Sequence, residues 1–465
     1  MIQWLAWGAE AFARARRERK PILLSITAAW CRACHEMDRT TYSDPDVAAA
    51  IRDRFVPVRV DTDRRPDINE RYNLGGWPTT AFLTADGELM TGGTFVAAER
   101  MMGVLARVAD AFDKSAFTSR SGLEAAASST EDSGASPDPD VDALVEAVFS
   151  TFDEEHGGFG VEPKFPHTAP LHLAALLFRQ AESDRWRRIV ERTLDAMWDG
   201  GLRDPQAGGF YRYATTRDWG LPHPEKLLET NAALLRAYAE AAAIFGRACD
   251  RDRSGAIAAF LATVLRAEGG GFYGSDADRV LYADANAAAA VALLESAAST
   301  GDTVLLQDAL ASFERVVLAC YKPGHGVAHC FDGTASVRGL LADQIATIGA
   351  LLAAHEATDD EPYQMMAEEL GHFVVREMWD AEGGGFFDRA GDADDVGLLR
   401  TRRKPFVANA EAAQVLARLD RIAHEFDFRP YALGALRAAA RQVEPQGPLA
   451  AHYLLAWHRV TVSTR

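Results

Sequence analysis

The chain has 465 residues, of which 48% are hydrophobic and 25% charged, and its formal net charge is −18. A chain of this length exceeds one ordinary hydrophobic core, so we expect two or three domains. The acidic excess is spread along the sequence, which disfavours nucleic acid and anionic membranes as partners. We find no apolar run of about 18 residues and therefore expect no membrane span. Only two of the five cysteines are closely paired, which argues against a disulfide-built secreted fold and favours the cytoplasm.

The chemistry of the N-terminal part is organised around residues 30–35, Trp-Cys-Arg-Ala-Cys-His. The apolar run before them, at 21–26, predicts a buried strand, and residues 36–39 read as helix. Two cysteines two residues apart at a strand-to-helix junction are typical of a thioredoxin-type redox pair. The helix N-terminus would stabilise a thiolate at Cys31, the position expected to be more exposed, and Cys34 would resolve a mixed disulfide.

Two other readings of this motif stay open. The same letters spell the attachment signature of c-type haem. That reading needs an exported chain, and residues 1–20 carry six charged side chains from Glu10 to Arg19 with no long apolar core, so we expect no signal peptide. A structural zinc site needs two more ligands at finger-like spacing, and the sequence has no second C-x-x-C.

The residues downstream favour thioredoxin. Residues 55–61 and 81–83 read as strands, and Trp77-Pro78 before the second of them resembles the cis-proline loop of thioredoxins. In thioredoxins that loop lies beside the cysteine pair and contacts an extended substrate. The resemblance therefore implies a role for Pro78 in catalysis, with Trp30, His35 and Trp77 contacting substrate. Asp86-Gly87 predicts a turn into an edge hairpin, and 99–112 is the expected last helix of the domain.

Longer stretches of this region resemble the thioredoxin-like domain of the spermatogenesis-associated protein 20 family. The matching stretches are Trp4, 20–24, 31–37, 60–68 and 75–78. Arg32 departs from that family, in which His is usual. Ser25 stands where thioredoxins carry a buried Asp, so the carboxylate that handles protons there is missing. Arg32 beside the nucleophile is expected to favour the reduced pair and make it more oxidising.

The composition divides the chain into three parts: a thioredoxin-like domain at 1–117, a polar linker at 118–139 and a helical domain at 140–465. The helical part contains a repeat. Gly-Gly-Phe recurs at 157–159, 208–210, 270–272 and 384–386, with a degenerate copy, Gly-His-Gly-Val, at 324–327. Each copy lies between a helix and a polar loop that leads into a second helix.

The repeat predicts six helical hairpins. First helices are expected to begin near Asp140, Asp184, Asp250, Asp302, Glu361 and Arg429, and second helices near Thr168, Glu225, Ala283, Gly339, Val407 and Pro448. Hairpins of about 55 residues suggest a closed (α/α)6 toroid, with an open solenoid as the alternative. The alanine-rich second helix at 283–299 favours the toroid, because inner helices crowd together.

Polar residues cluster where the second helices start, and in a toroid these ends face a central funnel. They are Lys164, His167, His223, Glu225, Lys226, Asp284, Asn286, Asp343, Gln344, Asn409 and Glu411. Helix capping explains the Asp and Asn residues in part. It does not explain cations at helix starts, where the dipole disfavours them. We therefore predict a ligand site in which Lys164, His223 and Glu225 share one pocket with Tyr213 and Trp219.

The family resemblance also covers this part, through 157–160, 163–167, 209–213, 222–226 and 271–278. It implies a fold similar to six-hairpin glycosidases and N-acylglucosamine 2-epimerases. An inverting glycosidase needs two carboxylates, for which Glu225, Asp284 and Asp343 are candidates. An epimerase would use His167 and His223 for proton transfer. Substrate contacts are expected from Lys164, His167, Arg212, Tyr213, Trp219, Lys226 and Asp343.

Four soft ligands fall within eleven residues: Cys320, His325, His329 and Cys330. The adjacency of His329 and Cys330 makes one tetrahedral zinc site cramped, so no metal or other cofactor is expected. Cys249 reads as a small core residue. The overall expectation is a thiol-disulfide redox protein whose toroid binds a sugar-like molecule, with a protein thiol or disulfide as partner. The alternative is a carbohydrate-active enzyme in which the thioredoxin-like domain is accessory.

Overall fold

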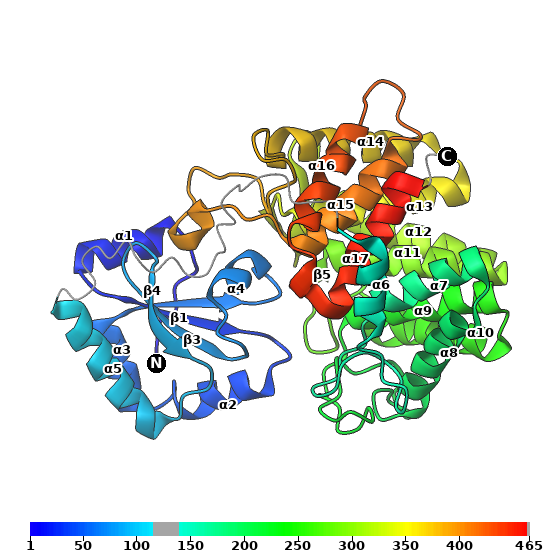
Figure 1. The fold of residues 1–465 in the computed structure, drawn as a ribbon. Coiled ribbons are helices and arrows are strands. Elements are labelled where there is room, and N and C mark those ends of the chain that lie inside the picture. The colour runs from blue at the N-terminus through cyan, green and yellow to red at the C-terminus, as the bar shows by residue number, and fades with distance from the viewer. Residues whose placement is uncertain (115–138, 463–465) are drawn as a thin grey trace. The chain divides into compact units, whose positions relative to one another are not determined.

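The computed structural model of the protein describes residues 1–114 and 139–462. The chain forms two compact units. The first comprises Met1–Ser136 together with Gly391–Arg402, and the second comprises Pro137–Ala390 and Arg403–Arg465. The predicted linker at 118–139 lies outside the described residues except for its last position. Figure 1 shows the helices and strands of both units.

The first unit is built on a four-stranded mixed sheet with the strand order β2-β1-β3-β4. Its strands are β1 (Ile22–Thr27), β2 (Val56–Asp61), β3 (Thr79–Leu83) and β4 (Leu89–Gly93). Its helices are α1 (Ala9–Glu18), α2 (Arg32–Thr40), α3 (Pro45–Arg54), α4 (Pro66–Tyr72) and α5 (Ala98–Asp113). Strand β1 is parallel to β2 and antiparallel to β3, so it is central and buried on both faces.

Successive side chains of β1 enter two separate cores, as the two-residue period of a strand requires. Ile22 and Leu24 pack with residues of α1 and α4, whereas Leu23 packs with residues of α2, α3 and α5. The sheet therefore lies between two helical layers. This arrangement places the C-terminal end of β1 next to the start of α2, where the cysteine pair lies. The predicted thioredoxin-like fold is confirmed.

A short segment from the C-terminal half of the sequence completes this unit. Val396 and Leu399 are buried in the core that contains Tyr72, and the Tyr72 hydroxyl accepts a hydrogen bond from Leu398 N (2.8 Å) while donating to Gly87 O (2.8 Å). A Cβ on Gly87 would lie 2.3 Å from the Cα of Gly397, so the turn is closely packed. The sequence division at 140–465 did not anticipate this insertion of Gly391–Arg402 into the first unit.

The second unit contains six helix pairs within the described residues. The first helices are α6 (Val141–Phe149), α8 (Asp184–Asp199), α10 (Ala248–Phe260), α12 (Thr303–Cys320), α14 (Glu361–Met378) and α16 (Arg429–Ala440). The second helices are α7 (Ala169–Ala181), α9 (Leu228–Phe245), α11 (Ala283–Thr300), α13 (Leu341–Thr358), α15 (Phe406–Leu419) and α17 (Ala450–Trp457). Its short 3-10 or π segments are η1 (Leu261–Leu265), η3 (Glu444–Leu449) and η4 (His458–Val462), whereas η2 (Gly397–Arg400) belongs to the first unit.

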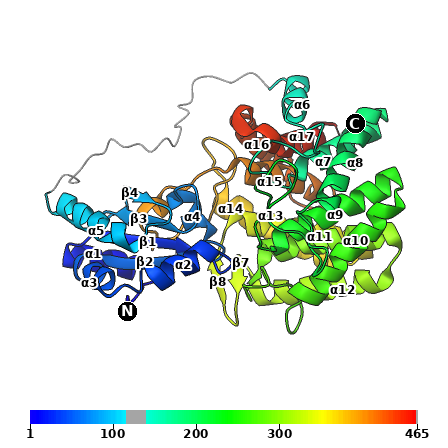
Figure 2. The same ribbon diagram turned by 90° about the horizontal axis from the view of Figure 1, so that it is seen from below.

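The second helices pack in sequence order, α7 to α17, and α17 also packs against α7, so the ring is closed (Figure 2). The predicted toroid is thus confirmed and the open solenoid is excluded. Helix α11 contributes Ala287, Ala289, Ala290 and Ala292 to the core, which allows α9 and α13 to approach it from both sides. Every predicted helix start lies within a few residues of the observed one.

In four of the inner helices, the fourth residue is an Asn or Gln whose side-chain amide makes the same two hydrogen bonds to a loop backbone. Asn231 Oδ1 accepts from Phe210 N (2.7 Å), and Asn231 Nδ2 donates to Phe210 O (3.0 Å). Asn286 does the same to Phe272, Gln344 to Val327 and Asn409 to Phe386. The amides therefore tie each glycine-aromatic loop to its inner helix, and the helix-capping interpretation of Asn286 and Asn409 is wrong.

The fourth repeat departs from the others because a β-ribbon replaces its glycine-aromatic loop. The ribbon consists of β6 (Tyr321–Lys322), β7 (Gly326–Phe331) and β8 (Ala335–Arg338), and β5 (Leu281–Tyr282) pairs with β7. The amide of Gln344 still binds Val327, the position of the missing phenylalanine. The degenerate copy in the sequence is thus the site of an added structural element.

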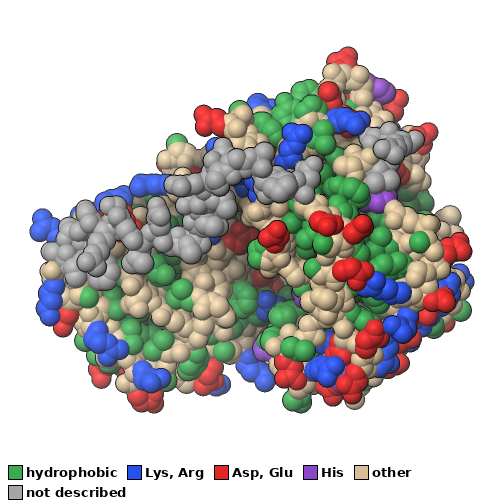
Figure 3. Space-filling model, viewed as in Figure 1, with side chains coloured by type: hydrophobic (Ala, Val, Ile, Leu, Met, Phe, Trp, Pro, Cys, Tyr) green, Lys and Arg blue, Asp and Glu red, His purple; other side chains and the backbone are tan. Residues whose placement is uncertain are grey.

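Within the described residues, no helix is both long enough and apolar enough to cross a membrane. Acidic and basic side chains are interspersed on the face shown in Figure 3. The strong negative charge of the sequence therefore does not collect in one acidic patch on that face.

Candidate functional site

The cysteine pair lies at the start of α2, where Cys31 is the N-terminal capping residue. Cys31 Sγ accepts a hydrogen bond from Cys34 N (3.1 Å), and the two residues form a disulfide with Cα atoms 5.2 Å apart. A thiolate at Cys31 would keep this N–H donor and gain the favourable end of the helix dipole. The two cysteines are 4% and 3% exposed, so Cys31 is not the clearly more exposed partner that the sequence suggested.

Two tryptophans pack against the disulfide. Trp30 and Trp77 meet edge to face at 5.5 Å, and both contact the small cluster formed by Cys31, Cys34 and Ala28. Trp30 Nε1 donates to Asp63 Oδ2 (2.6 Å), which fixes that ring. The peptide bond between Trp77 and Pro78 is cis, as the sequence predicted. Trp30 and Trp77 thus lie against the disulfide, and their contact with a substrate stays a prediction.

Two further residues of this region, His35 and Ser25, are held by contacts within the first unit or buried in it. His35 Nε2 lies 2.8 Å from Ala29 O, so the imidazole is held against the loop before the pair. Ser25 is fully buried, and its neighbours across β3 include Thr80, whose hydroxyl lies 3.2 Å from Tyr42 Oη. Burial raises the pKa of Tyr42. Neutral hydroxyl groups thus occupy the region where thioredoxins hold a carboxylate.

Three of the predicted toroid residues have structural contacts. Lys164 is fully buried, and its Nζ donates to Asp153 Oδ2 (2.7 Å) and Arg217 O (2.8 Å). Lys226 Nζ donates likewise to Asp204 Oδ2 (2.7 Å) and Gly208 O (2.8 Å). Trp219 is 1% exposed. We therefore withdraw Lys164, Trp219 and Lys226 from the ligand-binding set, because their polar groups are satisfied within the protein.

The buried ion pair between Lys164 and Asp153 is reinforced by Arg217. Burial opposes ionisation of Asp153, but hydrogen bonds from Arg217 and Lys164 outweigh burial and hold the pKa of Asp153 well below its usual range. A buried charge without such partners would be costly. The Lys164 side chain therefore supports the first glycine loop, and its ammonium group is engaged within the protein rather than offered to a ligand beside His223 and Glu225.

His223 and Glu225 do form a pair. His223 Nδ1 lies 2.7 Å from Glu225 Oε2, and the imidazole stacks on Tyr213 at 4.7 Å. Tyr213 stacks in turn on Phe165, whose ring lies 6.2 Å from that of His167. Glu225 is buried, whereas the His223 side chain is 42% exposed. This arrangement gives an imidazole backed by a carboxylate, beside a partly exposed row of rings.

Glu229, one turn after Glu225, interacts electrostatically with Asp284 of the next inner helix. Burial raises the pKa of Glu229, Asp284 raises it further, and Arg212 opposes the change. The Glu229 side chain is nevertheless accessible to solvent. A carboxylate that is accessible yet surrounded by protein fits a concave wall. Arg212 and Asp284 were predicted site residues, and the structure places both within electrostatic reach of Glu229.

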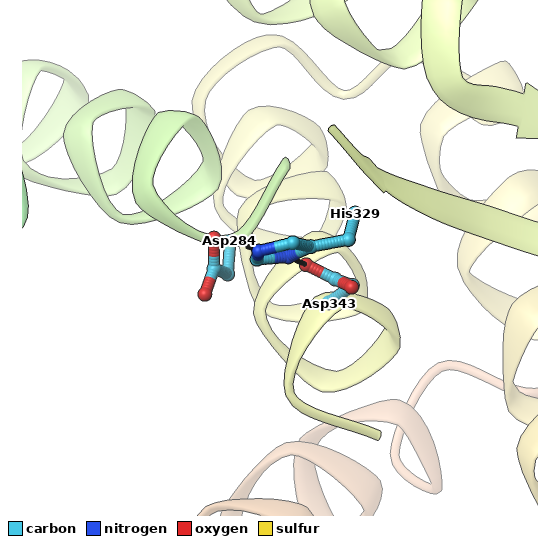
Figure 4. A group of neighbouring side chains, drawn as sticks. All are labelled: Asp284, His329 and Asp343. Atoms are coloured by element: carbon cyan, nitrogen blue, oxygen red, sulfur yellow. Dashed lines mark hydrogen bonds and ion pairs between the residues drawn. The ribbon is translucent and has the colours of Figure 1, made fainter. Parts of the chain in front are cut away.

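The tightest cluster joins Asp284, Asp343 and His329 (Figure 4). His329 Nδ1 lies 2.9 Å from Asp343 Oδ1 and 3.9 Å from Asp284 Oδ1. Burial raises the pKa of Asp284, while His329 lowers it and Asp343 raises it. His329 and Asp343 are buried, and the Asp284 side chain is 38% exposed.

The four-ligand zinc constellation does not form among the described residues. His325 is exposed before β7, and His329 joins the two aspartates rather than the cysteines. Burial raises the pKa of Cys320 to about 12, which disfavours the thiolate that zinc requires. Cys330 Sγ lies 3.1 Å from Ser336 Oγ.

Sequence reasoning missed two residues of the toroid site. Glu229 was not considered, although its position one turn after Glu225 was available. His329 was considered only as a partner of the cysteines. The signal that could have identified it was the failure of the fourth repeat, which marks an insertion into the regular architecture.

Comparisons with known proteins support both folds. The family model Thioredox_DsbH, described as a protein of unknown function (DUF255), matches residues 1–131. Human spermatogenesis-associated protein 20 is 31% identical over 311 residues, covering 60% of this chain and 39% of that protein. The matched chain thus spans about two fifths of the length of this relative. The predicted family resemblance is confirmed.

A second relative matches a shorter stretch of the chain. The thiol:disulfide interchange protein DsbD of Vibrio vulnificus is 33% identical over 82 residues, covering 17% of this chain and 14% of that protein.

Two solved structures resemble the toroid. A cellobiose 2-epimerase from Bacillus thermoamylovorans has a TM-score of 0.57 at 11% identity, covering 68% of this chain and 98% of its own. A D-mannose isomerase has a TM-score of 0.58 at 15% identity, covering 72% and 100%. These two likenesses concern the fold.

Proposed function

We propose that the first unit catalyses thiol–disulfide exchange at Cys31 and Cys34. The observation that carries this proposal is the disulfide at the N-terminus of α2, in which Cys31 Sγ already accepts the Cys34 N–H. The similarity to the thiol:disulfide interchange protein DsbD adds support. The family model that covers the unit has no assigned function, so the activity rests on the geometry.

The reaction exchanges two thiols for one disulfide. In the reduced protein, the Cys31 thiolate attacks one sulfur of a partner disulfide and forms a mixed disulfide, releasing the other partner sulfur as a thiolate. Cys34 loses its proton and attacks Cys31 Sγ, which releases the second partner thiol and restores the Cys31–Cys34 disulfide. The partner is reduced by two electrons and the pair is oxidised. The reverse sequence oxidises a partner dithiol.

The experiment measures reduction of insulin disulfides by the full chain with dithiothreitol as the electron source. Cys31→Ser should eliminate the protein-dependent rate, because the exchange begins with attack by the Cys31 thiolate. Cys249→Ser is the matched control, since Cys249 is an exposed free cysteine outside the pair rather than the core residue that the sequence suggested, and it should retain the rate. After reduction, iodoacetamide should label Cys31 before Cys34. A full rate in Cys31→Ser, or equal labelling of all cysteines, contradicts the proposal.

A second function is favoured for the toroid, namely binding of a carbohydrate-like ligand where the inner helices begin. The supporting observation is the stack of Phe165, Tyr213 and the half-exposed His223, whose imidazole is hydrogen-bonded to Glu225. Flat ring faces beside a polar pair suit a sugar, which has apolar C–H faces and hydroxyl edges. The fold shared with a cellobiose 2-epimerase and a D-mannose isomerase is consistent with this use.

Glu225→Gln tests the second function. It keeps the shape of the side chain but removes its charge, so binding of mannose, glucose or cellobiose measured by calorimetry should weaken at least about tenfold. Glu146→Gln, which changes an exposed ion pair with Arg185, is the control and should leave binding unchanged. If no sugar binds the unaltered chain, or if Glu225→Gln binds sugar normally, this function fails while the thiol chemistry remains untested by the result.

A further inference from the structure

The cluster of Asp284, His329 and Asp343 is held in place by strand pairing between β5 and β7 and by an amide contact between α13 and β7. Tyr282 of β5 pairs with Cys330 of β7, which brings the start of α11, and hence Asp284, beside His329. The Gln344 amide binds Val327 on both its N–H and its C=O. Since Asp343 precedes Gln344 and His329 follows Val327 by two residues, this amide also sets the distance between the two side chains.

Three elements far apart in the sequence therefore converge on one point. One ligand atom from each residue lies within 4.8 Å of the others. Figure 4 shows the imidazole of His329 between the two carboxylates. Two of its members, His329 and Asp343, come from the fourth repeat, whose glycine-aromatic loop is replaced by a β-ribbon, and Asp284 comes from the inner helix of the third.

The protein alone leaves part of this cluster unsatisfied. Asp343 is completely buried; its Oδ1 contacts His329 Nδ1, but its Oδ2 is buried with no hydrogen-bond partner. A buried carboxylate oxygen without a donor costs free energy, and a bound water or ion is one way to satisfy such an atom. A second carboxylate, that of Asp284, stands 3.9 Å from the same imidazole nitrogen. Two carboxylates thus share a single imidazole.

We propose that Asp284, His329 and Asp343 bind a divalent first-row transition-metal ion. Two carboxylate oxygens and one imidazole nitrogen are a hard-to-borderline ligand set, which suits Mn²⁺, Co²⁺ or Zn²⁺ better than the soft Cu⁺ ion. The ion would neutralise the excess negative charge and would leave coordination positions for solvent or a ligand on the side of Asp284, the accessible member. Cys320 and Cys330 are not ligands in this proposal.

A hydrogen-bonded pair of His329 and Asp343 without metal is the competing explanation. It accounts for the 2.9 Å contact. It does not account for the buried Oδ2 of Asp343 or for the second carboxylate at 3.9 Å from the imidazole. The two explanations predict different results when a divalent metal ion is added without any other ligand. A metal site binds one equivalent per chain, whereas the hydrogen-bonded pair binds none.

The test uses the full chain with its Cys31–Cys34 disulfide oxidised, so that the redox thiols cannot bind metal. After treatment with a chelator and desalting, Co²⁺ is titrated and followed by its visible absorption, and Mn²⁺ and Zn²⁺ are titrated by calorimetry. We expect one equivalent to bind, and a higher thermal unfolding midpoint with metal than without. Mg²⁺ is the comparison ion and should bind more weakly.

Asp284→Asn is the principal variant, because the partly exposed side chain can be changed with little risk to the fold. It should weaken binding at least about tenfold. His329→Gln and Asp343→Asn should abolish the one-equivalent binding, with circular dichroism showing whether each variant is folded. His325→Gln, which changes the exposed neighbouring histidine, is the control and should bind normally. Failure of the unaltered chain to bind any of these ions, or unchanged binding by folded Asp284→Asn, overturns the proposal.

Discussion

The two units hold their chemical groups in different ways. In the first unit, the cysteine pair lies within the first turn of α2, and Cys31, Cys34 and Trp30 are separated by at most four positions in the sequence. In the toroid, Asp284, His329 and Asp343 come from two helices and a strand spread over about 60 residues. A local site depends on one helix start, whereas a distributed site depends on every contact that fixes the spacing of its elements. Changes to the toroid's supports should therefore damage its site and spare the thiol chemistry.

The largest effect on stability is expected at the buried ion pair between Lys164 and Asp153 of the first glycine loop. Lys164→Met removes the ammonium group from Asp153 and leaves a buried carboxylate with Arg217 as its remaining side-chain partner. The free energy of unfolding of the toroid should fall by about 3–5 kcal/mol, measured by urea denaturation. The insulin reduction rate should be retained in the folded protein. A loss below about 1 kcal/mol would mean that Lys164 is not a structural support.

The acid dependence of this pair has a definite sign. The pKa of Asp153 is lowered in the folded protein, so its contribution to stability is present above its ordinary value near 4 and is lost as pH falls through the folded value. The difference in stability between the unaltered chain and Asp153→Asn should therefore shrink as pH is lowered below about 4. Denaturation at a series of pH values measures it, and a difference independent of pH would contradict the ion pair.

The next largest effect on stability is expected at Asn286, and it shows whether this amide ties a loop to the helix or caps the helix. Asn286→Asp would be tolerated at a capping position, where both residues accept a hydrogen bond. In the observed geometry Asn286 Nδ2 donates to Phe272 O and Tyr282 O, and a carboxylate there would face two carbonyl oxygens. We expect a loss of stability of at least about 1–3 kcal/mol, together with weaker Co²⁺ binding because β5 shifts. Asn73→Asp, in a turn of the first unit, is a control for the substitution itself. Unchanged stability would restore the capping interpretation.

A smaller effect is expected where Gly391–Arg402 joins the first unit. Tyr72→Phe removes the hydroxyl that accepts from Leu398 N and donates to Gly87 O. Two hydrogen bonds are lost, so the first unit should be destabilised by about 1–2 kcal/mol. Hydrogen exchange at Leu398 N should accelerate, while the labelling rate of Cys31 stays the same. Unaltered exchange at Leu398 would show that the hydroxyl does not hold this segment.

The smallest effect has the opposite sign. Burial raises the pKa of Glu229, so the folded protein is destabilised by ionising this carboxylate as pH rises through the folded value. Glu229→Gln should therefore raise stability at neutral pH, by less than about 1 kcal/mol, and this gain should vanish at pH below the ordinary glutamate pKa. Loss of stability in Glu229→Gln at neutral pH would indicate a structural role instead. A gain in stability with reduced sugar binding would mark Glu229 as a residue retained for ligand binding.

The sequence determined the features that local rules control. Strand β1, the start of α2 with Cys31 and Cys34, and the turn before the cis Pro78 follow from neighbouring residues. The six helix pairs follow from the repeat, because each copy encodes its own loop and helix. Tertiary structure decided how the side chains at those helix starts are used. Lys164 looked like a funnel residue, but its partner Asp153 belongs to the first glycine loop, and only the folded chain brings them together. His329 and Asp343 meet because a strand inserted in one repeat is tied to the next inner helix, and no local pattern reports a distance between separate elements.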